Sequence, residues 1–314
     1  MQVRILTPAQ KWQQWLAFIT RKHNLTHYSN LAPVLTKQEC KDLCGHRKTK
    51  KAPWSRKSQY VTIAYPNYKP QITIQNNSIG WDSKGNLMFL YLQNVLPQRV
   101  RDTAFAAFQQ MQFRSCNKSG RLELKGAVAF NGHKNPEASE INTGYMHLAR
   151  EFKIKQSAVA LPQMKNVVPL LDAMSGIYAR VLPRYWRIPN MRIKQHHRHG
   201  FTPFTTITFL KSAPASVHLD ARNGADSLAC MTSVADPDPA KRYSGGAFCF
   251  IEYGVEIRVR PGDLLIGATP KNWHCNLSPV QGLKYSVIAY SKKALRRQNP
   301  LLPEDSPKPK RRKK

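Results

Sequence analysis

The sequence predicts an α+β fold in which a jelly-roll β sandwich is buttressed by helices. Apolar residues at helical spacing prevail up to about residue 181, and short strand-like runs with Gly and Pro at their joints prevail after residue 202. Helix and strand patterns do not alternate regularly along the chain. Short strands that follow helices in this way favour an antiparallel sandwich over a parallel sheet.

Helices are expected at residues 11–19, 98–112 and 164–181. In each segment apolar residues recur every three or four positions, which gives a helix one buried face. The tryptophans of the first segment follow this spacing, and such residues are more often part of a core than platforms for nucleic acid. Pro169 is expected to shorten the start of the third helix, because proline lacks a backbone N–H.

Strands are expected where β-branched and aromatic residues gather between turn residues. The run from Val255 to Arg260 alternates apolar and polar residues with period two, as a strand with one buried face does. The other expected strands are residues 87–92, 204–210, 248–253, 264–266 and 285–290.

The charge of the chain indicates a polyanionic partner. Lys and Arg total 49 against 18 acidic residues, a formal net charge of +31, which exceeds what solubility requires. Nucleic acid is the expected partner; an anionic membrane surface is the rival, but no apolar run approaches spanning length. Up to about Tyr68, basic residues interleave with aromatic ones, which suits phosphate contact and base stacking.

The C-terminal residues 307–314 form a basic block with prolines and nothing to bury. We expect a disordered tail that acts as a nuclear localisation signal or a non-specific DNA contact, with a solubilising tail as the alternative. The first residues lack the pattern of a secretory signal, and six scattered cysteines indicate reduced, intracellular thiols. His23, His27, Cys40 and Cys44 could satisfy tetrahedral zinc, but their intervals are not those of a standard finger, which favours unrelated polar and core side chains.

His218, Asp220 and His274 are the candidate metal ligands of the chain. His218 and Asp220 are separated by one residue, and His274 follows far downstream, beyond a strand-like run. At a strand end, residues two apart point the same way and can chelate together. Two imidazoles and a carboxylate can occupy one face of an octahedral Fe(II), leaving three positions for co-substrate and O₂. The pattern therefore indicates a non-haem iron oxygenase.

Five segments between about Gly85 and Lys293 carry a resemblance to a known family. They are Asn94-Val-Leu-Pro97 between a strand and a helix, His218-Leu-Asp220-Ala-Arg-Asn223, Ser244-Gly-Gly-Ala-Phe248, Arg260-Pro-Gly-Asp-Leu-Leu265, and His274 followed by Lys284-Tyr-Ser-Val-Ile-Ala-Tyr290. Together they resemble the TET/JBP family of Fe(II)- and 2-oxoglutarate-dependent dioxygenases, which oxidise methyl groups on nucleobases. The resemblance implies a double-stranded β-helix, the jelly-roll architecture expected above.

The expected organisation has three parts. Residues 1–84 form a basic, aromatic-containing N-terminal region, residues 85–296 a TET/JBP-like dioxygenase domain, and residues 297–314 a disordered basic tail.

The resemblance implies roles for the metal and co-substrate residues. His218, Asp220 and His274 would hold iron. 2-Oxoglutarate would chelate the iron, and a basic residue about ten positions beyond the distal histidine, normally arginine, would bind its far carboxylate; here that position is Lys284, with Ser286 as a supporting hydroxyl. Lysine neutralises a carboxylate as a point charge without the bidentate fork of arginine. A surface lysine, and ascorbate as reductant or alternative co-substrate, stay open.

The resemblance also implies contacts with a base rotated out of the duplex. Asn223, with Arg222 beside it, lies where family members carry a residue that reads the flipped pyrimidine, and an amide can pair with a base edge. A polar turn after the metal-bearing strand is the alternative. The basic residues 192–199 could line a DNA groove, with a solvated loop as an equal alternative.

We therefore expect a nuclear, monomeric 5-methylcytosine dioxygenase that acts on methylated duplex DNA to give 5-hydroxymethylcytosine, as in DNA demethylation, with the number of oxidation steps left open. No membrane and no obligate protein partner is expected. The rivals are the same chemistry on N6-methyladenine, thymine, RNA or a protein side chain, and a non-catalytic DNA-binding module with a vestigial iron site. Such a module would bind DNA with steep salt dependence and consume no co-substrate.

Overall fold

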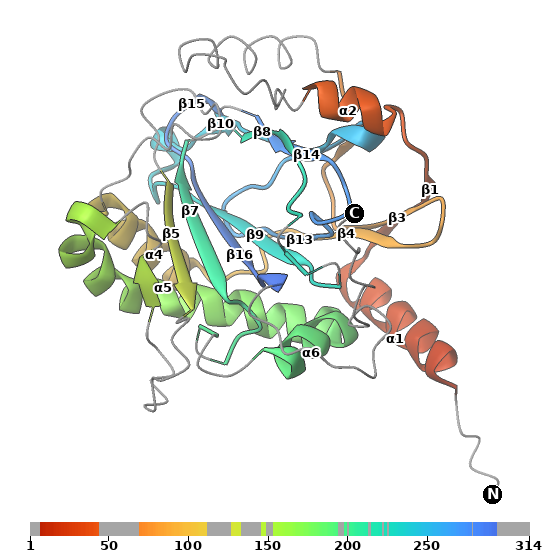
Figure 1. Ribbon diagram of the computed structural model, residues 1–314, viewed down its shortest axis with the longest axis horizontal. Coiled ribbons are helices and arrows are strands. Elements are labelled where there is room, and N and C mark those ends of the chain that lie inside the picture. Colours follow the sequence, from red (N-terminus) through yellow and green to blue (C-terminus); the bar gives the residue numbers. More distant parts are fainter. Residues whose placement is uncertain are drawn as a thin grey trace, which may run out of the picture.

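The structure is a computed structural model that describes residues 7–43, 69–111, 127–132, 146–148, 153–193, 198–199, 201–212, 215–221, 223–224, 226–277 and 279–293. Two β sheets face each other, and helices cover the outer face of the larger sheet (Figure 1). The predicted α+β fold with a helix-buttressed jelly-roll sandwich is confirmed.

The larger sheet has nine strands among the described residues. Its neighbours pair antiparallel except β1 and β3, which are parallel. In spatial order the strands are β1 (Thr26–Leu31), β3 (Ser78–Asp82), β4 (Leu87–Leu92), β13 (Leu264–Gly267), β9 (Ala229–Val234), β16 (Tyr285–Tyr290), β7 (Thr206–Lys211), β5 (Ala127–Gly132) and β6 (Met146–Leu148).

The smaller sheet has five strands in the described part of the chain, and its outermost pair, β2 with β12, is parallel. In spatial order these are β2 (Ile72–Ile74), β12 (Val255–Ile257), β11 (Phe248–Phe250), β14 (His274–Asn276) and β8 (Ala215–His218). A further short pair, β10 (Ser244–Gly245) and β15 (Pro279–Gln281), lies beside them.

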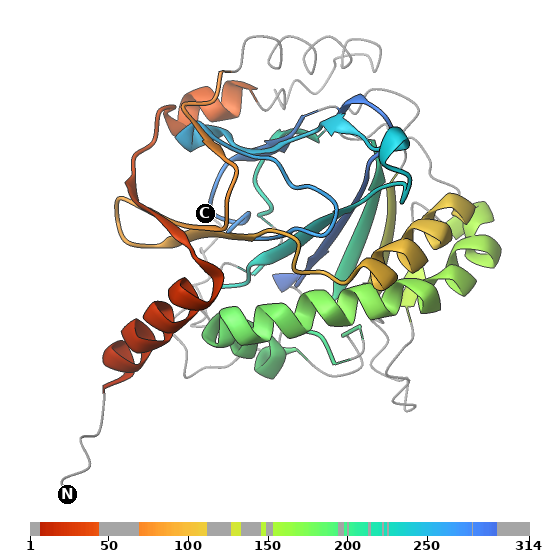
Figure 2. The same ribbon diagram turned by 180° about the vertical axis from the view of Figure 1, so that it is seen from behind.

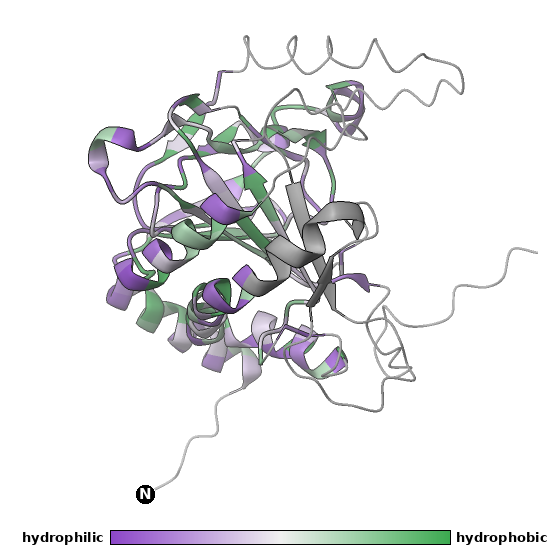
Figure 3. Ribbon diagram, turned by 90° about the vertical axis from the view of Figure 1, so that its left-hand side faces the viewer, coloured by the Kyte–Doolittle hydropathy of each residue, from purple (hydrophilic) through white to green (hydrophobic). Residues whose placement is uncertain are grey.

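Four helices pack on the outer face of the larger sheet: α1 (Pro8–His23), α4 (Gln98–Gln110), α5 (Lys153–Val181) and α6 (Pro183–Arg192). Figure 2 shows α5 running across this face with α4 beside it. The smaller sheet is covered on its outer side by α2 (Lys37–Leu43), where Cys40 packs with Cys249 and Cys275. Figure 3 shows hydrophobic residues gathered on the inner strands and hydrophilic ones on the outer helices.

Alternation along the strands separates two apolar layers. On β4, Leu90 and Leu92 pack toward the helices, whereas Phe89 and Tyr91 point between the two sheets. Both faces of this strand are buried, so its sequence is apolar throughout. Phe89 and Phe250, from the two opposed sheets, stack with ring centroids 6.0 Å apart. The sandwich therefore has one core under the helices and a second between the sheets.

The predicted helices form, with one difference. The helix expected at residues 164–181 begins at Lys153, so the expectation that Pro169 shortens it is wrong. A proline inside a helix costs about 3 kcal/mol. Val167, Leu170 and Leu171 around it are buried, and each contributes roughly 1.5–3 kcal/mol when it leaves water, so packing outweighs the lost bond.

The strand expected at residues 248–253 ends at Phe250, because Ile251–Tyr253 form a 3-10 turn that Gly254 closes at φ 64°. The strand expected at residues 255–260 is shorter as well and ends at Ile257. The sequence did not reveal α6 or the short strand β14, whereas β8 ends at His218, where a strand end was expected. Two- to four-residue strands carry too little pattern to be recognised alone.

The N-terminal region shares its sheets with the rest of the molecule. β1 and β3 extend the larger sheet, β2 extends the smaller one, and the expected boundary at Gly85 falls in the turn between β3 and β4. Residues 44–68 and 294–314, which hold much of the basic N-terminal segment and the tail, lie outside the described residues. No helix among the described residues is long and apolar enough to cross a membrane.

Candidate active site

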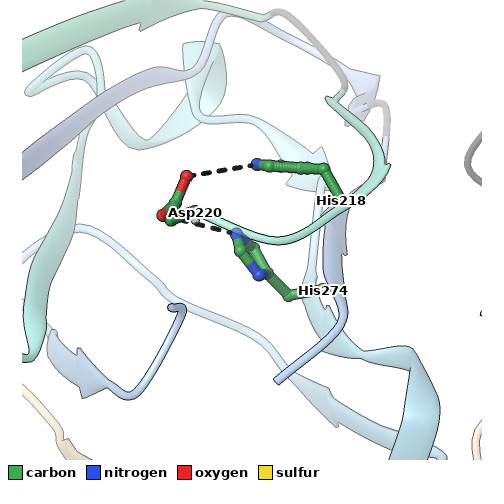
Figure 4. Close-up of side chains that lie close together, drawn as sticks. All are labelled: His218, Asp220 and His274. Carbon is green, nitrogen blue, oxygen red and sulfur yellow. Dashed lines mark ion pairs between the residues drawn. The ribbon is translucent and has the colours of Figure 1, made fainter. Parts of the chain in front are cut away.

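The three predicted metal ligands come together between β8 and β14. These strands pair antiparallel with His218 directly opposite His274, and Asp220 follows in the loop that leaves β8. Asp220 Oδ1 lies 3.7 Å from His218 Nε2, and Asp220 Oδ2 lies 3.7 Å from His274 Nε2. All three ligand atoms lie within 4.8 Å of one another. Both separations are longer than a hydrogen-bond distance, so the three groups do not bond to one another. Their side chains point toward a common position (Figure 4).

His274 is oriented by its neighbour's backbone. Its Nδ1 lies 3.0 Å from the carbonyl oxygen of Asn272, and because a carbonyl only accepts, Nδ1 carries the proton. The lone pair is then on Nε2, which faces Asp220. Burial, reinforced by the charge of His218, lowers the pKa of His274 to about 4, although Asp220 opposes the shift. A neutral imidazole held by a second hydrogen bond is the form that binds a metal.

A small recess lies between the two sheets, near this triad. Phe248 connects the two, because it lines the recess and stacks on His274 with ring centroids 5.4 Å apart. The polar lining comes from both sheets: Thr232 and Ser233 of β9, Asn276 of β14, Lys284, and Ser286 of β16. A small polar molecule in the recess would therefore lie next to the metal ligands.

Lys284 is buried, which excludes the surface lysine that the sequence left open. It is 6% exposed, and its ammonium group donates to the carbonyl oxygen of Gly246. The same ammonium lies 5.4 Å from the ring centroid of Tyr243, a cation–π geometry. Burial lowers the pKa of Lys284 to about 8, with Cys249 opposing the shift. The group is a cation held in advance on the wall of the recess.

Gly246 makes this position possible. Its backbone has φ 68°, and a Cβ atom there would lie 3.1 Å from Cδ of Lys284. Any other residue would be strained and would press on the lysine. The Ser244-Gly-Gly segment of the sequence thus serves the buried ammonium group.

At this point the site can be compared with known proteins. The family Tet_JBP, described as the oxygenase domain of the 2OGFeDO superfamily, matches residues 126–293, which is more than half of the chain. The chain belongs to the TET/JBP family. The predicted double-stranded β-helix and the predicted cofactors, Fe(II), 2-oxoglutarate and O₂, are confirmed at this level.

Two curated relatives illustrate the likeness within the TET/JBP family. Thymine dioxygenase JBP1 of Crithidia fasciculata is 24% identical over 209 residues, covering 64% of this chain and 24% of that protein. Thymine dioxygenase JBP1-A of Trypanosoma cruzi (strain CL Brener) is 28% identical over 225 residues, covering 68% of this chain and 24% of that protein. The chain spans about a quarter of the length of the curated relatives it matches.

Among solved structures, NgTET1 in complex with 5mC DNA matches with a TM-score of 0.55. The match covers 92% of each chain at 12% sequence identity, so it shows the fold alone.

The residues present fit the cofactors of the TET/JBP family. Two imidazoles and a carboxylate are the donor set that suits Fe(II), and Nε2 of His274 is directed at the shared point by its bond to Asn272. His218 and Asp220 keep 30% and 27% of their side chains exposed, so the triad is open on their side. The cation of Lys284 and the hydroxyl of Ser286 line the adjoining recess, and both are groups that can bind a carboxylate.

Asn276 is a lining residue that sequence reasoning missed. It lies two positions beyond His274 on β14, so both side chains point to the same face of the strand. The same two-residue period that links His218 to Asp220 was the available signal. Phe248 and Asn272 gave no such signal, since a stacking ring and a backbone carbonyl are found only in the folded chain.

Of the two residues expected to contact a base, Asn223 is 7% exposed and its backbone N–H donates to the carbonyl oxygen of Asp220 at 2.8 Å. It closes the turn after the metal-bearing segment, as the alternative interpretation expected. Arg222 lies outside the described residues, as do residues 194–197 of the basic loop. Arg192, at the start of that loop, pairs with Asp226 at 2.7 Å.

The described residues agree with the prediction that His23, His27 and Cys40 are unrelated polar and core side chains rather than zinc ligands. His27 bonds Thr20 at 2.8 Å, and Cys40 is fully buried behind the smaller sheet, where burial raises its pKa to about 12. Cys44 lies outside the described residues. Within the described part of the chain, the triad is the cluster of potential metal ligands that the structure brings together.

The Arg260-Pro-Gly-Asp segment is structural. The carboxylate of Asp263 accepts bonds from the backbone N–H groups of Asn94 and Arg260, at 2.9 and 2.8 Å, and from the hydroxyl of Tyr91. It joins the turn before β13 to the end of β4. Burial raises the pKa of Asp263 despite these bonds.

Proposed function

We propose that this TET/JBP protein hydroxylates the 5-methyl group of 5-methylcytosine in DNA, with 2-oxoglutarate as co-substrate. The observation that carries the proposal is the triad of His218, Asp220 and His274, which Phe248 connects to a recess with a buried lysine. A metal site next to a dicarboxylate site is the arrangement that such an oxidation requires. The net charge of +31 supports a polyanionic substrate.

The chain's own residues have separate roles. His218, Asp220 and His274 would hold Fe(II), which when bound supplies the activation of O₂ coupled to decarboxylation of 2-oxoglutarate to succinate. Lys284 attracts the far carboxylate of the co-substrate, and Ser286 offers a hydroxyl. Phe248 lines the recess and belongs to the apolar core between the two sheets, and it is proposed to help exclude water from the co-substrate.

The base would approach from the open side of the triad, where His218 and Asp220 are exposed. The residues after Asp220, including Arg222 and Asn223, are proposed to border a base rotated out of a methylated duplex. The enzyme is proposed to act as a monomer in the nucleus, where the basic block at residues 307–314 would direct it. Removal of that block from a fluorescent fusion tests the localisation.

Thymine is the second candidate substrate. The observation that favours it is the likeness, at 24–28% identity, to proteins named thymine dioxygenase. Thymine and 5-methylcytosine carry the same 5-methyl group and differ at position 4 of the ring, so one active site geometry serves either base.

Nucleoside mass spectrometry tests the proposal. The Fe(II)-loaded protein is incubated with DNA containing 5-methylcytosine or thymine, with 2-oxoglutarate and ascorbate supplied separately and together, and succinate is measured in parallel. Oxidised 5-methylcytosine that depends on 2-oxoglutarate is expected. Asp220→Ala should abolish it, while Asp42→Ala in α2, a matched loss of a carboxylate, should not.

The other outcomes each discriminate. Turnover by Asp220→Ala equal to that of the wild type would rule the mechanism out. Oxidised thymine alone favours the second candidate, and modification with ascorbate alone indicates an altered co-substrate. Steeply salt-dependent DNA binding without succinate favours a non-catalytic binding module.

A further inference from the structure

Two large apolar side chains lie in water beside a basic helix. Phe201 is 79% exposed and Met191 is 67% exposed. Single exposed apolar residues are common on protein surfaces. A hydrogen bond joins the segments that carry them, because Arg198, three residues before Phe201, donates to the side-chain oxygen of Asn190, which precedes Met191.

Phe201 is held in a fixed position. Its tight turn is closed by a bond from the N–H of His199 to the carbonyl oxygen of Phe204 at 3.0 Å, and by one from the N–H of Thr202 to the carbonyl oxygen of His199 at 3.2 Å. His199 and Thr202 are 2% and 1% exposed. The turn is therefore anchored in the protein while its aromatic tip projects into solvent.

The exposed face of α6 is basic and leads to Met191. Arg184, Arg187 and Met191 are spaced three and four residues apart, so they lie on one side of the helix, and all three are exposed. The helix contains no acidic residue. Tyr185 and Trp186 pack against the core instead. A row of arginines of this kind complements a phosphate backbone.

Hydrogen bonds connect this surface to the metal-binding loop. Four residues beyond Asp220, the backbone N–H of Gly224 donates to the carbonyl oxygen of Ser291 at 3.1 Å. The hydroxyl of Ser291 donates to the carbonyl oxygen of Pro203, two residues beyond Phe201. The Arg192–Asp226 ion pair ties the end of α6 to the same segment. The segment of Phe201 and the C-terminal end of α6 are therefore both joined to the chain that follows Asp220.

We propose that Phe201, with Met191, inserts into the base stack of a DNA duplex next to the nucleotide that enters the active site, while Arg184 and Arg187 bind the flanking phosphates. The proposal rests on the proposed function, since it assumes a duplex substrate. Extrusion of a base leaves a gap and unstacks its neighbours, and a rigid apolar side chain fills such a gap. Phe201 then lowers the cost of extrusion, which a single-stranded substrate does not incur.

The test compares duplex and single-stranded DNA carrying one target 5-methylcytosine. Phe201→Ala is expected to lower the rate of duplex oxidation by about tenfold, the scale of one lost base–aromatic contact, and to leave single-stranded oxidation unchanged. Phe201→Trp should retain the duplex rate. Phe18→Ala in α1, which removes another exposed phenylalanine, is the matched control and should behave as wild type.

Equal loss on both substrates, or no loss on the duplex, would overturn the role of Phe201. Arg184→Gln with Arg187→Gln is expected to reduce the slope of log affinity against log salt by about two, and an unchanged slope would refute the phosphate contacts.

Failure of the proposed function is separable from failure of this inference. If the wild type oxidises neither substrate, the function is refuted. Insertion of Phe201 into the base stack is then tested by binding alone, from the fluorescence of a 2-aminopurine placed beside the target base. The fluorescence should rise on binding of the wild type and not of Phe201→Ala, and an equal rise with both proteins would overturn the insertion of Phe201.

Discussion

The two faces of the nine-stranded sheet differ in chemistry although the same strands build both. On β16, Tyr285, Val287 and Ala289 pack toward the helices, while Ser286 and Ile288 of the same strand line the recess. Lys284, just before the strand, joins the recess side. Because side chains alternate across a strand, neighbouring residues serve stability and chemistry separately. Substitutions on adjacent residues should therefore have effects of different kinds.

The largest expected effect is on the helix-covered face. Phe209 of β7 is fully buried, with its ring centroid 4.8 Å from that of Phe108 in α4. Phe209→Ala should lower the free energy of unfolding by about 3–5 kcal/mol, because it leaves a cavity in a packed layer. Urea unfolding followed by circular dichroism measures this. Thr208→Ala, on the other face, should cost about 1 kcal/mol or less. An equal loss in both variants would contradict the separation of the two faces.

Substitutions on the face of the sheet that lines the recess should change the affinity for 2-oxoglutarate. Lys284→Met should weaken 2-oxoglutarate binding by roughly 10- to 150-fold, since a hydrogen bond to a charged group contributes about 1.5–3 kcal/mol. Stability should not fall, because the change removes a buried cation. Titration calorimetry of the metal-loaded protein measures the affinity, with Lys211→Met on the edge of β7 as control. Unchanged affinity in Lys284→Met would remove this residue from the co-substrate site.

The pH dependence sharpens the assignment of Lys284. Its pKa is about 8, so the charged form that binds a dicarboxylate is lost as the pH rises through 8, and affinity should fall about tenfold per pH unit above it. Burial raises the pKa of Tyr243, and a hydrogen bond with Cys275 together with burial raises that of Cys249, so both groups near the ammonium stay neutral there.

The stability of the co-substrate-free protein should change in the opposite sense. The pKa of lysine in the unfolded chain is about 10.4, so between pH 8 and that value the unfolded state holds the extra proton. The contribution of Lys284 to the free energy of unfolding therefore rises with pH over this window. The difference between wild type and Lys284→Met isolates it. A pH-independent difference would show that the lysine does not titrate there.

The smallest expected effect is at Ser286. Ser286→Ala should raise the KM for 2-oxoglutarate by about two- to tenfold, the scale of one neutral hydrogen bond, and leave unfolding unchanged. Steady-state kinetics with co-substrate varied at saturating DNA measures this. A fall in kcat without a change in KM would place Ser286 with the reacting centre instead.

Sequence patterns were sufficient where long segments carried a clear period. The strand at residues 285–290 and the helix beginning at residue 98 formed as expected, because each has a regular apolar face. The candidate metal ligands were also recognisable from the sequence. His218 and Asp220 are two residues apart, as at a strand end, and the second histidine, His274, follows downstream of a strand-like run. Short strands and the 3-10 turn at Ile251–Tyr253 had no comparable period.

The sequence by itself predicted the jelly-roll class, three candidate metal ligands and a polyanionic partner, because residue type and local spacing carry that information. Only the tertiary structure decided that Lys284 is buried, that Asn272 fixes the proton on His274, and that β1, β2 and β3 complete the two sheets. Each of these depends on contacts between residues far apart in the chain. Burial, backbone partners and strand order arise only when those distant segments pack, so no local pattern encodes them.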